Sequence, residues 1–539
     1  MTDTPLLSVR NLSIEFPTSA GILRAVDDVT WSVSAGETLA ILGESGSGKS
    51  VSASAVMDLV DVPPARITGG EILFKGQDLL KQPRHARKAL NGKAISMIFQ
   101  DPLAALNPVY PVGWQIAETL RVHGVDRYTA QRRAVELLAR VRIDEPERRV
   151  KDYPHQFSGG QRQRIMIASA IALQPDLLIA DEPTSALDVT VQAQVLDLLK
   201  SIQSESGMGM IMITHDLSVV ERVADKVVVM QAGRVVEEGR TADVLIRPQH
   251  PYTRQLLDAV PGSHGFSAPP PPRESTALLE VGHVSRVYGA ASKEPGRQPV
   301  KAVDDVSFTM RAGETLGIVG ESGSGKSTLV RMLLGLDRPT SGTIRFDGKD
   351  MLTMSRSETF TVRRRMQFVF QDPTASLNPR MTIQRIVSEP WAIHKGVLPR
   401  DRWRSRVAEL LEQVGLRRDH ADRYPHEFSG GQRQRVAIAR SLALNPEVIV
   451  CDEAVSALDV SIQAQVIALL KDLRANLGLS YVFVAHDLGL IRDFATHVLV
   501  MYKGQVVEQG RVEAIYDTPQ HDYTRSLLAA SASSLIQVA

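Results

Sequence analysis

The chain has 539 residues, enough for two or more domains that each bury a core of their own. Its hydrophobic content of 43% and charged content of 23% are those of an ordinary globular protein, and a net charge of +1 argues against a broadly basic surface for nucleic acid. The single cysteine, Cys451, excludes an internal disulfide framework and suits a reducing compartment.

Strands and helices are predicted to alternate along the first half of the chain. Strands are expected at Leu7–Phe16 and Trp31–Val33, and Thr38–Leu42 is an apolar run typical of a buried strand. This run leads into Gly43–Ser50, which matches G-x-x-x-x-G-K-[ST], and then into a helix. The order predicts an α/β fold.

The first half continues with further buried strands that end on polar residues. A strand at Ile95–Phe99 ends at Gln100 and precedes a long, mostly helical region that includes Arg132–Val141. The later expected elements are a strand at Asp176–Ala180 ending on acids, a strand at Gly209–Thr214 ending at His215, and a hairpin over Val227–Arg234.

The second half repeats these landmarks in the same order. Gly320–Ser327 copies the loop, and Gln371, Asp452 and His486 follow it. We therefore predict two domains of one fold, at 1–260 and 278–539, joined by a proline-rich spacer at 261–277.

The two halves differ in two segments that are expected to form loops. The first half is longer between the glycine-rich loop and Gln100, mostly within Val60–Gly70, which predicts a loop insertion. In the second half, the polar stretch Ala291–Pro299 predicts an exposed hairpin loop.

The glycine-rich loops carry the pattern that phosphate binding requires. Glycine permits left-handed backbone conformations that turn N–H groups toward an anion, and the following helix adds the positive end of its dipole. Lys49 and Lys326 are expected to reach the β- and γ-phosphates, and Ser50 and Ser327 are expected to bind Mg²⁺.

Two acids follow a buried strand in each half. Asp181 and Asp452 are expected to hold Mg²⁺, and the next residues, Glu182 and Glu453, are placed to polarise an attacking water. The alternative is that acids at strand ends only cap the next helix. The neighbouring glycine-rich loops favour the catalytic interpretation.

Phe157–Arg164 and Phe428–Arg435 share the sequence FSGGQRQR, and each opens an Ala/Ile-rich helix. Serine is a good N-cap, and paired glycines leave backbone N–H groups open to an anion. A simple capped helix is the alternative interpretation for a single copy.

Taken together, these motifs resemble those of the ATP-binding-cassette (ABC) ATPases over nearly the whole chain. The resemblance rests on the two Walker A loops, two FSGGQ signatures, DEPTSALD and DEAVSALD after the buried strands, and the histidines of ITHD and VAHD. It implies two tandem P-loop nucleotide-binding domains of the α/β class, each with a RecA-like core, an antiparallel β subdomain and an α-helical subdomain.

The resemblance also implies two composite ATP sites, in which the Walker A loop of one cassette faces the signature of the other. The implied catalytic residues are Glu182, Glu453, His215 and His486. The implied Mg²⁺ ligands are Ser50, Gln100, Asp181, Ser327, Gln371 and Asp452. The implied nucleotide-binding residues of the two loops are Gly43, Glu44, Ser45, Gly46, Ser47, Gly48, Lys49, Ser50 and Val51, and their counterparts Gly320, Glu321, Ser322, Gly323, Ser324, Gly325, Lys326, Ser327 and Thr328. The implied signature residues are Ser158, Gly159, Gly160, Gln161, Ser429, Gly430, Gly431 and Gln432. The glutamines Gln100 and Gln371 are also implied to bind nucleotide, and Phe16 and Tyr288 are the implied stacking partners of adenine.

Finer motifs resemble the dipeptide and oligopeptide importer branch. QDPxxxLNP begins at Gln100 and at Gln371, Tyr-Pro-His precedes each signature, and PQHxYTR ends each half. The first half is similar to the D-type subunit and the second to the F-type. Members of this branch often carry a cysteine-rich tail with an iron–sulfur cluster; this chain has no such cysteines, so no cluster is expected.

The resemblance implies two membrane permease subunits as partners, docked through coupling helices near the glutamine loops, and indirectly an extracytoplasmic solute-binding protein. No apolar run reaches the roughly 18 residues of a membrane span, so we expect a peripheral protein on the cytoplasmic face of the membrane. We expect no nucleic-acid partner. One chain supplies both cassettes, so no homodimer is needed. Nickel chelates, glutathione, opines or peptide-like antibiotics are alternative cargoes. A tandem-cassette ATPase acting on ribosomes or DNA is the rival class.

Overall fold

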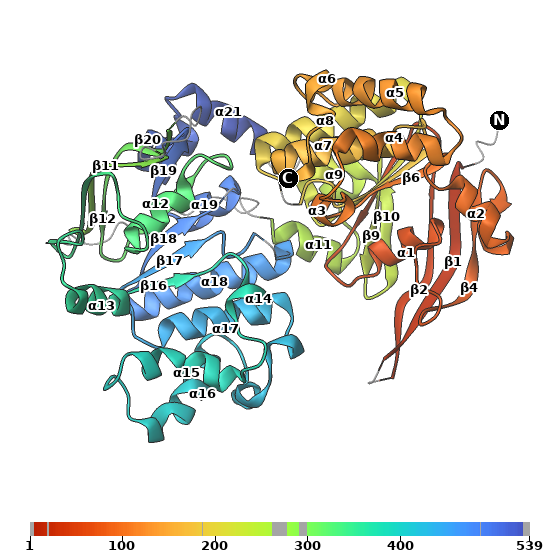
Figure 1. Ribbon diagram of the computed structural model, residues 1–539. Coiled ribbons are helices and arrows are strands. Elements are labelled where there is room, and N and C mark those ends of the chain that lie inside the picture. The colour runs from red at the N-terminus through yellow and green to blue at the C-terminus, as the bar shows by residue number, and fades with distance from the viewer. Residues whose placement is uncertain are drawn as a thin grey trace. The chain divides into compact units, whose positions relative to one another are not determined.

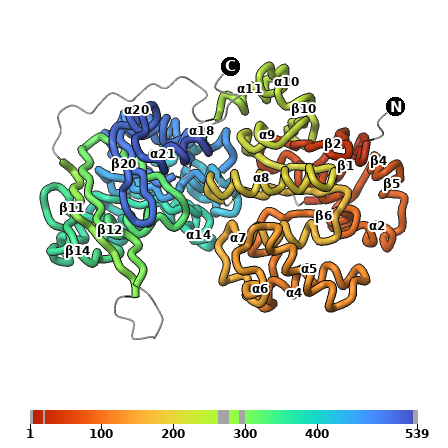
Figure 2. The backbone as a smooth tube through the Cα atoms, turned by 90° about the horizontal axis from the view of Figure 1, so that it is seen from above, coloured from red at the N-terminus to blue at the C-terminus, as the bar shows by residue number. Residues whose placement is uncertain are grey.

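The computed structural model describes residues 5–18, 21–185, 187–260, 277–289, 299–456, 458–485 and 487–531. The described residues form two compact units, one up to residue 259 and the other from 260 to 531 (Figures 1 and 2). The predicted spacer at 261–277 and the predicted loop Ala291–Pro299 lie outside the described residues, except for the last residue of each.

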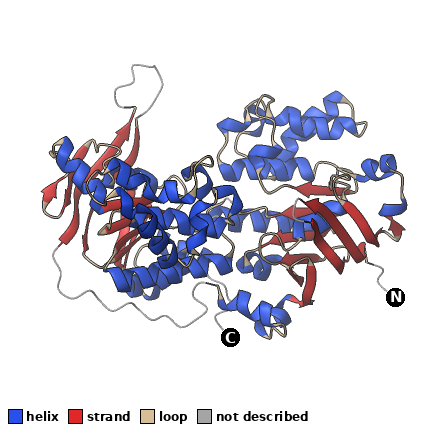
Figure 3. Cartoon of the chain, turned by 90° about the horizontal axis from the view of Figure 1, so that it is seen from below, coloured by secondary structure: helices blue, strands red, loops and turns tan. Residues whose placement is uncertain are grey.

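The core of the first unit is a six-stranded sheet in the order β10-β9-β3-β8-β7-β6. The pairs β3–β8, β3–β9, β7–β8 and β6–β7 are parallel, and β9–β10 is an antiparallel hairpin. Every residue of β3 and β8 is buried. Alternate residues of β8 pack in a helical cluster on one face and in a cluster shared with the antiparallel sheet on the other, so both faces are covered (helices are blue and strands red in Figure 3). The strands span Thr38–Leu42 (β3), Ile95–Ile98 (β6), Leu177–Asp181 (β7), Gly209–Thr214 (β8), Lys226–Gln231 (β9) and Arg234–Arg240 (β10).

A second, antiparallel sheet in the order β2-β1-β4-β5 completes the β part of the first unit. Its inner face shares one hydrophobic cluster with β3 and α1, and the largest fully buried side chain there is Trp31. The strands span Leu7–Thr18 (β1), Gly21–Val33 (β2), Arg66–Phe74 (β4) and Gln77–Asp78 (β5).

The helices of the first unit cover the core sheet and build a separate helical layer. α4 packs against α5, and both pack against α7, which carries the signature at its start (Figure 1). The helices span Lys49–Val56 (α1), Arg84–Leu90 (α2), Pro102–Ala105 (α3), Val112–Val122 (α4), Arg127–Arg140 (α5), Pro146–Arg149 (α6), Gly159–Ala170 (α7), Val189–Ser206 (α8), Leu217–Val223 (α9), Thr241–Ile246 (α10) and Pro251–Asp258 (α11).

The second unit repeats this plan. Its core sheet has the order β16-β17-β18-β13-β19-β20, and its antiparallel sheet has the order β12-β11-β14-β15. The strands span Ala277–Tyr288 (β11), Val300–Arg311 (β12), Thr315–Val319 (β13), Ser341–Phe346 (β14), Lys349–Asp350 (β15), Met366–Val369 (β16), Val448–Asp452 (β17), Ser480–Val484 (β18), His497–Tyr502 (β19) and Gln505–Arg511 (β20). The helices span Lys326–Leu333 (α12), Arg356–Arg365 (α13), Pro373–Ser376 (α14), Ile383–Ile393 (α15), Trp403–Gln413 (α16), Gly430–Leu442 (α17), Val460–Leu477 (α18), Leu488–Phe494 (α19), Val512–Asp517 (α20) and Asp522–Ser531 (α21).

The predicted α/β class with two copies of one fold is confirmed, and two local predictions need correction. The stretch Val60–Gly70 is not wholly a loop, because β4 begins at Arg66 and is longer than its counterpart β14. The short predicted strand Trp31–Val33 is the end of the longer β2, which pairs with β1. Among the described residues, no helix combines the length and the apolarity needed to cross a bilayer.

Candidate active sites

The glycine-rich loop of each unit connects the central strand to a helix, β3 to α1 and β13 to α12. Gly43 has φ +153°, and a Cβ there would lie 2.2 Å from the Met230 carbonyl oxygen. Gly48 has φ +94°, and its Cβ would lie 2.3 Å from the Ala25 carbonyl oxygen. Both conformation and space therefore require glycine. Gly320 and Gly325 repeat the pattern, each with a clash at 2.2 Å.

The loop lysine is buried and held by backbone oxygens of its own loop. Lys49 Nζ donates to the carbonyls of Gly43 at 2.7 Å and Glu44 at 2.8 Å, and Lys326 makes the same bonds at the same distances. The ammonium group is thus positioned inside the loop, where it can compensate the charge of a bound anion.

A buried serine hydroxyl in each loop has no hydrogen-bond partner among the described residues. The two hydroxyls belong to Ser47 and Ser324, which are both 4% exposed. Buried hydroxyls in proteins are nearly always paired. A phosphate oxygen is a suitable acceptor, since the loop surrounds that position with backbone N–H groups and a lysine.

The first acid after the buried strand lies against the loop serine. Ser50 Oγ donates to Asp181 Oδ1 at 3.0 Å. Burial raises the pKa of Asp181, and the charge of Glu182 raises it further, against the hydrogen bond from Ser50. Burial and the neighbouring acid, Glu453, likewise raise the pKa of Asp452, whose Oδ1 is buried without a partner among the described residues.

These acids fit a divalent cation. Both aspartates are half-buried, and a nearby cation would stabilise their ionised form, which the raised pKa disfavours. A carboxylate beside a serine hydroxyl is also an oxygen-ligand set that suits Mg²⁺. No group of three or more His, Cys, Asp or Glu side chains among the described residues could hold a metal on its own. Mg²⁺ in such sites usually takes one or two protein ligands and completes its shell with phosphate oxygens and water.

The second acid, Glu182, has a side chain held from two sides. Its Oε1 lies 3.0 Å from His215 Nδ1, and its Oε2 accepts from Gln100 Nε2 at 2.7 Å. Burial acts to raise the pKa of Glu182, but the hydrogen bond and charge of His215, the charge of Lys49 and the amide of Gln100 outweigh it and lower the pKa. These contacts therefore favour the ionised form of Glu182.

The second unit reproduces this arrangement as far as it is described. Glu453 Oε2 accepts from Gln371 Nε2 at 2.7 Å, and the backbone of Glu453 has φ +47°, as Glu182 has φ +44°. The N–H of each glutamate donates to the neighbouring strand, to Ile213 and Val484 respectively. The predicted histidine, His486, lies outside the described residues.

The signature residues form a helix cap in each unit. Ser158 Oγ accepts from the Gln161 N–H at 3.3 Å, and Gln161 Oε1 accepts from the Ser158 N–H at 3.1 Å; Ser429 and Gln432 form the same capping box. A Cβ on the second glycine would clash with the next long helix: at Gly160 it would lie 2.4 Å from Val191, and at Gly431 it would lie 2.3 Å from Ile462. The capped-helix interpretation thus describes the local structure; Gly159 and Gly430 lie in the same first turns.

The two aromatic candidates for adenine lie in the antiparallel sheets. Phe16, on β1, is half-buried and packs against the core of its unit. Tyr288 ends β11 and is 39% exposed; its hydroxyl donates to Asp337 at 3.3 Å, and the Arg286 guanidinium lies 4.7 Å from its ring centre. One face of Tyr288 is therefore already in contact with a cation.

A further contact to the glycine-rich loop was not predicted from the sequence. The hydroxyl of Tyr252 accepts from the N–H of Glu44 at 3.2 Å, and that of Tyr523 accepts from the N–H of Glu321 at 3.0 Å. Both tyrosines belong to the PQHxYTR motif. The sequence showed this motif as a feature of the importer branch, but it did not indicate a contact with the loop.

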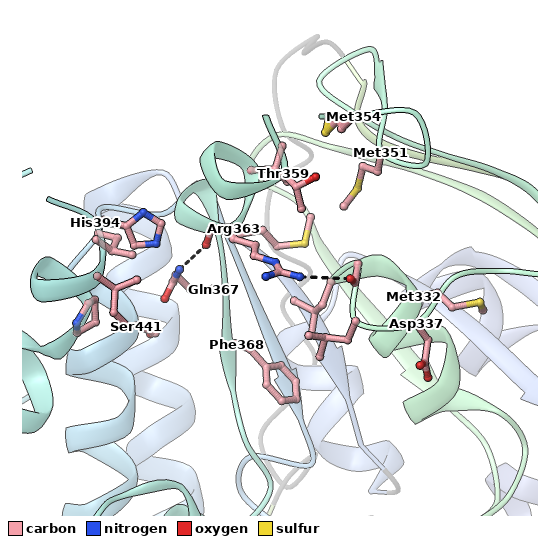
Figure 4. Close-up of a pocket in the computed structure, with 18 of the residues that line it drawn as sticks. Met332, Asp337, Met351, Met354, Thr359, Arg363, Gln367, Phe368, His394 and Ser441 are labelled. Carbon is pink, nitrogen blue, oxygen red and sulfur yellow. Dashed lines mark hydrogen bonds between the residues drawn. The ribbon is translucent and has the colours of Figure 1, made fainter. Parts of the chain in front are cut away.

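A pocket of about 580 Å³ opens in the second unit near the predicted glutamine loop (Figure 4). Phe370, immediately before Gln371, lines it and is 47% exposed. Arg363 reaches the Gly335 carbonyl across the pocket at 3.5 Å, and Gln367 Nε2 donates to the Arg363 carbonyl at 2.5 Å. Its methionine lining consists of Met332, Met351, Met354 and Met366.

Two family models match this chain. The ABC transporter model matches residues 26–185 and 303–456, and the model of the oligopeptide/dipeptide transporter C-terminal region matches 236–273 and 507–534.

Individual proteins match over nearly the full length. The peptidoglycan transport ATP-binding protein YejF of Agrobacterium fabrum is 47% identical over 531 residues, which cover 98% of this chain and 96% of that protein. The glutathione import ATP-binding protein GsiA of Escherichia coli strain K12 is 47% identical over 556 residues, which cover 97% of this chain and 89% of that protein. The chain therefore belongs to the ABC transporter ATPases, as a member with two cassettes that each carry the oligopeptide/dipeptide transporter C-terminal region.

Proposed function

We propose that this chain hydrolyses ATP to drive a membrane importer of dipeptides or oligopeptides. The observation that carries the proposal is that each unit combines a loop built for phosphate, a half-buried aspartate beside a serine hydroxyl, and a glutamate held by a glutamine, with a C-terminal region of the oligopeptide/dipeptide type. Relatives named for peptidoglycan transport and glutathione import support a cargo that contains peptide bonds.

We propose two composite ATP sites, each shared by the two cassettes. The cassettes are proposed to span 1–260 and 278–539, with the spacer 261–277 between them. One site would combine Gly43–Ser50 with Ser429–Gln432, and the other would combine Gly320–Ser327 with Ser158–Gln161. The capped helix starts support this arrangement, because each signature leaves first-turn N–H groups for an anion.

The chemistry proposed for the first site follows from its contacts. Lys49 and the loop N–H groups would bind the phosphates, and Glu182 would accept a proton from the attacking water while His215 and Gln100 hold its carboxylate in place. Mg²⁺, held by Ser50, Asp181 and Gln100, would neutralise charge on the phosphates when bound. Glu453, Gln371 and His486 would take these roles in the second site, with Ser327 and Asp452 toward the metal.

We propose that the pocket beside Gln371 receives a coupling helix from one permease subunit. Its exposed apolar rim includes Phe370 and Ile393, which are 47% and 59% exposed, and its methionines can adapt to an apolar helix face (Figure 4). In the first unit, exposed Phe99 precedes Gln100, and Tyr110 and Trp114 stack nearby in the sequence with ring centres 4.2 Å apart. The two units would thus offer different side chains to the two permeases.

The chain would lie on the cytoplasmic face of the membrane, bound to its two permeases and dependent on an extracytoplasmic binding protein for cargo. One chain would supply both cassettes. We propose no iron–sulfur cluster, because Cys451 is fully buried in β17 and burial raises the pKa of its thiol. Phe16 and Tyr288 remain the candidates to stack on adenine.

Reconstitution of the chain in liposomes with its two permeases and its binding protein would test the proposal. We expect ATP hydrolysis to rise when the binding protein is loaded with a dipeptide or oligopeptide, and labelled peptide to accumulate inside. Glutathione, a nickel chelate, an opine and a peptide-like antibiotic serve as the competing cargoes. Stimulation by one of these alone would reassign the cargo, and ATPase activity that responds only to ribosomes or DNA would favour the rival class.

A further inference from the structure

We propose that Tyr252 and Tyr523 are positioning residues that hold the nucleotide-binding loops in the shape that accepts ATP. This inference rests on the proposed function of the loops, and it assigns a role to the PQHxYTR motif. Through this tyrosine, the motif near the end of each cassette would hold the Walker A loop of the same cassette in place.

Each tyrosine contacts the loop of its own unit through its hydroxyl group. The hydroxyl of Tyr252 accepts the N–H of Glu44, the second residue of the loop, at 3.2 Å, and Tyr252 is only 6% exposed. The hydroxyl of Tyr523 accepts the N–H of Glu321 at 3.0 Å. The same bond occurs in two units whose surrounding residues differ: Tyr523 packs on Tyr502 at 4.2 Å, whereas Gln231 occupies the corresponding end of β9.

The rest of the motif orients this tyrosine. Glu237 on β10 accepts the N–H groups of Gln249 at 2.8 Å and His250 at 3.0 Å. His250 Nδ1 then caps α11 by accepting the N–H of Tyr252 at 3.2 Å, and Arg254 Nε donates to the Pro248 carbonyl at 3.0 Å. These bonds determine where α11 begins.

The second unit contains the same frame. Glu508 accepts the N–H groups of Gln520 at 2.8 Å and His521 at 3.0 Å, and His521 Nδ1 accepts the N–H of Tyr523 at 3.1 Å. Arg525 donates to the Pro519 carbonyl at 3.0 Å. The conserved geometry within one chain indicates that the motif is built to place the tyrosine ring.

The turn that precedes β10, and its counterpart before β20, contact the loop at a second point. The N–H of Gly233, in the turn between β9 and β10, donates to the Ser47 carbonyl at 3.1 Å, and that of Gly504 donates to the Ser324 carbonyl at 3.0 Å. The loop is therefore held near its start and near its middle. Removing the tyrosine hydroxyl would leave a loop N–H without this acceptor and allow the loop's first residues to turn.

The test compares tyrosine-to-phenylalanine variants of the full chain. We expect Y252F and Y523F, separately and together, to weaken binding of a fluorescent ATP analogue with Mg²⁺ by about 5- to 10-fold per site, the loss expected for one hydrogen bond with a desolvated donor. In ATP hydrolysis the KM should rise while kcat changes less than 2-fold, since Glu182 and Glu453 are untouched.

Two control variants separate positioning from general stability. Y128F changes a tyrosine on α5 that is 76% exposed and should leave binding and melting temperature unchanged. W391F removes a buried hydrogen bond to the Ala443 carbonyl, 2.7 Å long, in the helical layer of the second unit, and should lower the melting temperature without changing the KM.

Three results distinguish the possible failures. Unchanged ATP affinity in the double Y252F, Y523F variant, with the wild-type chain binding ATP normally, would overturn the inference and leave the proposed function intact. A lower melting temperature in the double variant with unchanged KM would also overturn it, because the tyrosines would then be only structural. A wild-type chain that binds no ATP would reject the proposed function itself.

Discussion

Glu182 Oε1 lies 3.0 Å from Nδ1 of His215, while its other oxygen accepts from Gln100. Two side chains, which follow the neighbouring strands β8 and β6, therefore converge on the carboxylate that follows β7. Side chains of the protein itself therefore hold the charge and the orientation of this carboxylate, which is the preorganisation that the proposed general base needs.

Replacing this carboxylate is expected to stop hydrolysis at its site. E182Q and E453Q should each reduce turnover at the affected site by about 10²- to 10⁴-fold, because the amide cannot accept the proton of the attacking water. Phosphate release measured at saturating ATP checks this, with E136Q on the exposed surface of α5 as the control. Full steady-state activity in the double variant would reject the general-base role.

Removing the charge of the half-buried Asp181 is expected to stabilise the protein without nucleotide. Burial and the adjacent glutamate both raise the pKa of Asp181, so its ionised form costs folding free energy at neutral pH. D181N should raise the melting temperature by about 2–4 °C in Mg²⁺-free buffer and weaken binding of Mg²⁺–ATP.

D176N provides the comparison for this stability measurement. Asp176 is 45% exposed and pairs with Lys75, so its loss should be neutral or slightly destabilising. Equal stabilisation by D181N and D176N would show that the effect comes from a general change in charge.

The first glycine of the loop is expected to be intolerant of any side chain. In G43A the new Cβ would lie 2.2 Å from the Met230 carbonyl, in addition to the strain of a positive φ. ATP binding should fall by more than 10-fold. G76A is the matched variant, since Gly76 has φ +80° with nothing within 4 Å of the added Cβ, and it should cost about 1 kcal/mol of stability without affecting nucleotide.

Glu237 and Glu508 accept hydrogen bonds from the two PQHxYTR motifs and are expected to make the stability of the protein depend on pH. Burial acts to raise the pKa of Glu237, but the N–H groups of Gln249 and His250 outweigh it, so the pKa is lowered. A lowered folded pKa gives stability that is complete above the unfolded pKa of about 4.3 and is lost as pH falls through the folded value.

E237Q should therefore melt about 2–4 °C below wild type at pH 7, and the difference should shrink as the pH falls below 4. Calorimetry between pH 3 and 7 measures this difference. A gap that stays constant with pH would contradict the assigned cause. E508Q offers the same test in the second unit, where the N–H groups of Gln520 and His521 overcome burial and lower the pKa of Glu508.

A charge in the pocket of the second unit is expected to uncouple the ATPase from the permeases. I393E places a carboxylate on a rim residue that is 59% exposed, so the isolated chain should keep its ATPase activity while binding to permease-containing liposomes falls at least 10-fold. L477E, on a side chain of α18 that is 49% exposed and does not line the pocket, is the control. Equal binding of the two variants would remove the pocket from the docking surface.

Single strands and loops could be located from the sequence, whereas the contacts between them could not. The strand β3 and the loop after it could be located because an apolar run and a glycine pattern are local signals. The contacts of Glu182 with His215 and Gln100 depend on the strand order β3-β8-β7-β6. This order pairs segments that are far apart in the chain, and it has no local sequence signature.

Other features were hidden for different physical reasons. The length of β4 came from pairing with β1, which overrode the turn-rich composition of Val60–Gly70. The contact of Tyr252 with the loop requires β9, β10 and α11 to fold back beside β3, so it is a tertiary property that the motif PQHxYTR alone does not reveal.

The place of β9 in the core sheet has a consequence for biosynthesis. β3 pairs on one side with β8 and on the other with β9, and both are translated long after it. An emerging chain therefore lacks neighbours for its central strand until the last quarter of the first unit has left the ribosome, and such distant pairing slows folding. Each half closes around its own late segment, and the first can do so while the second is still being made.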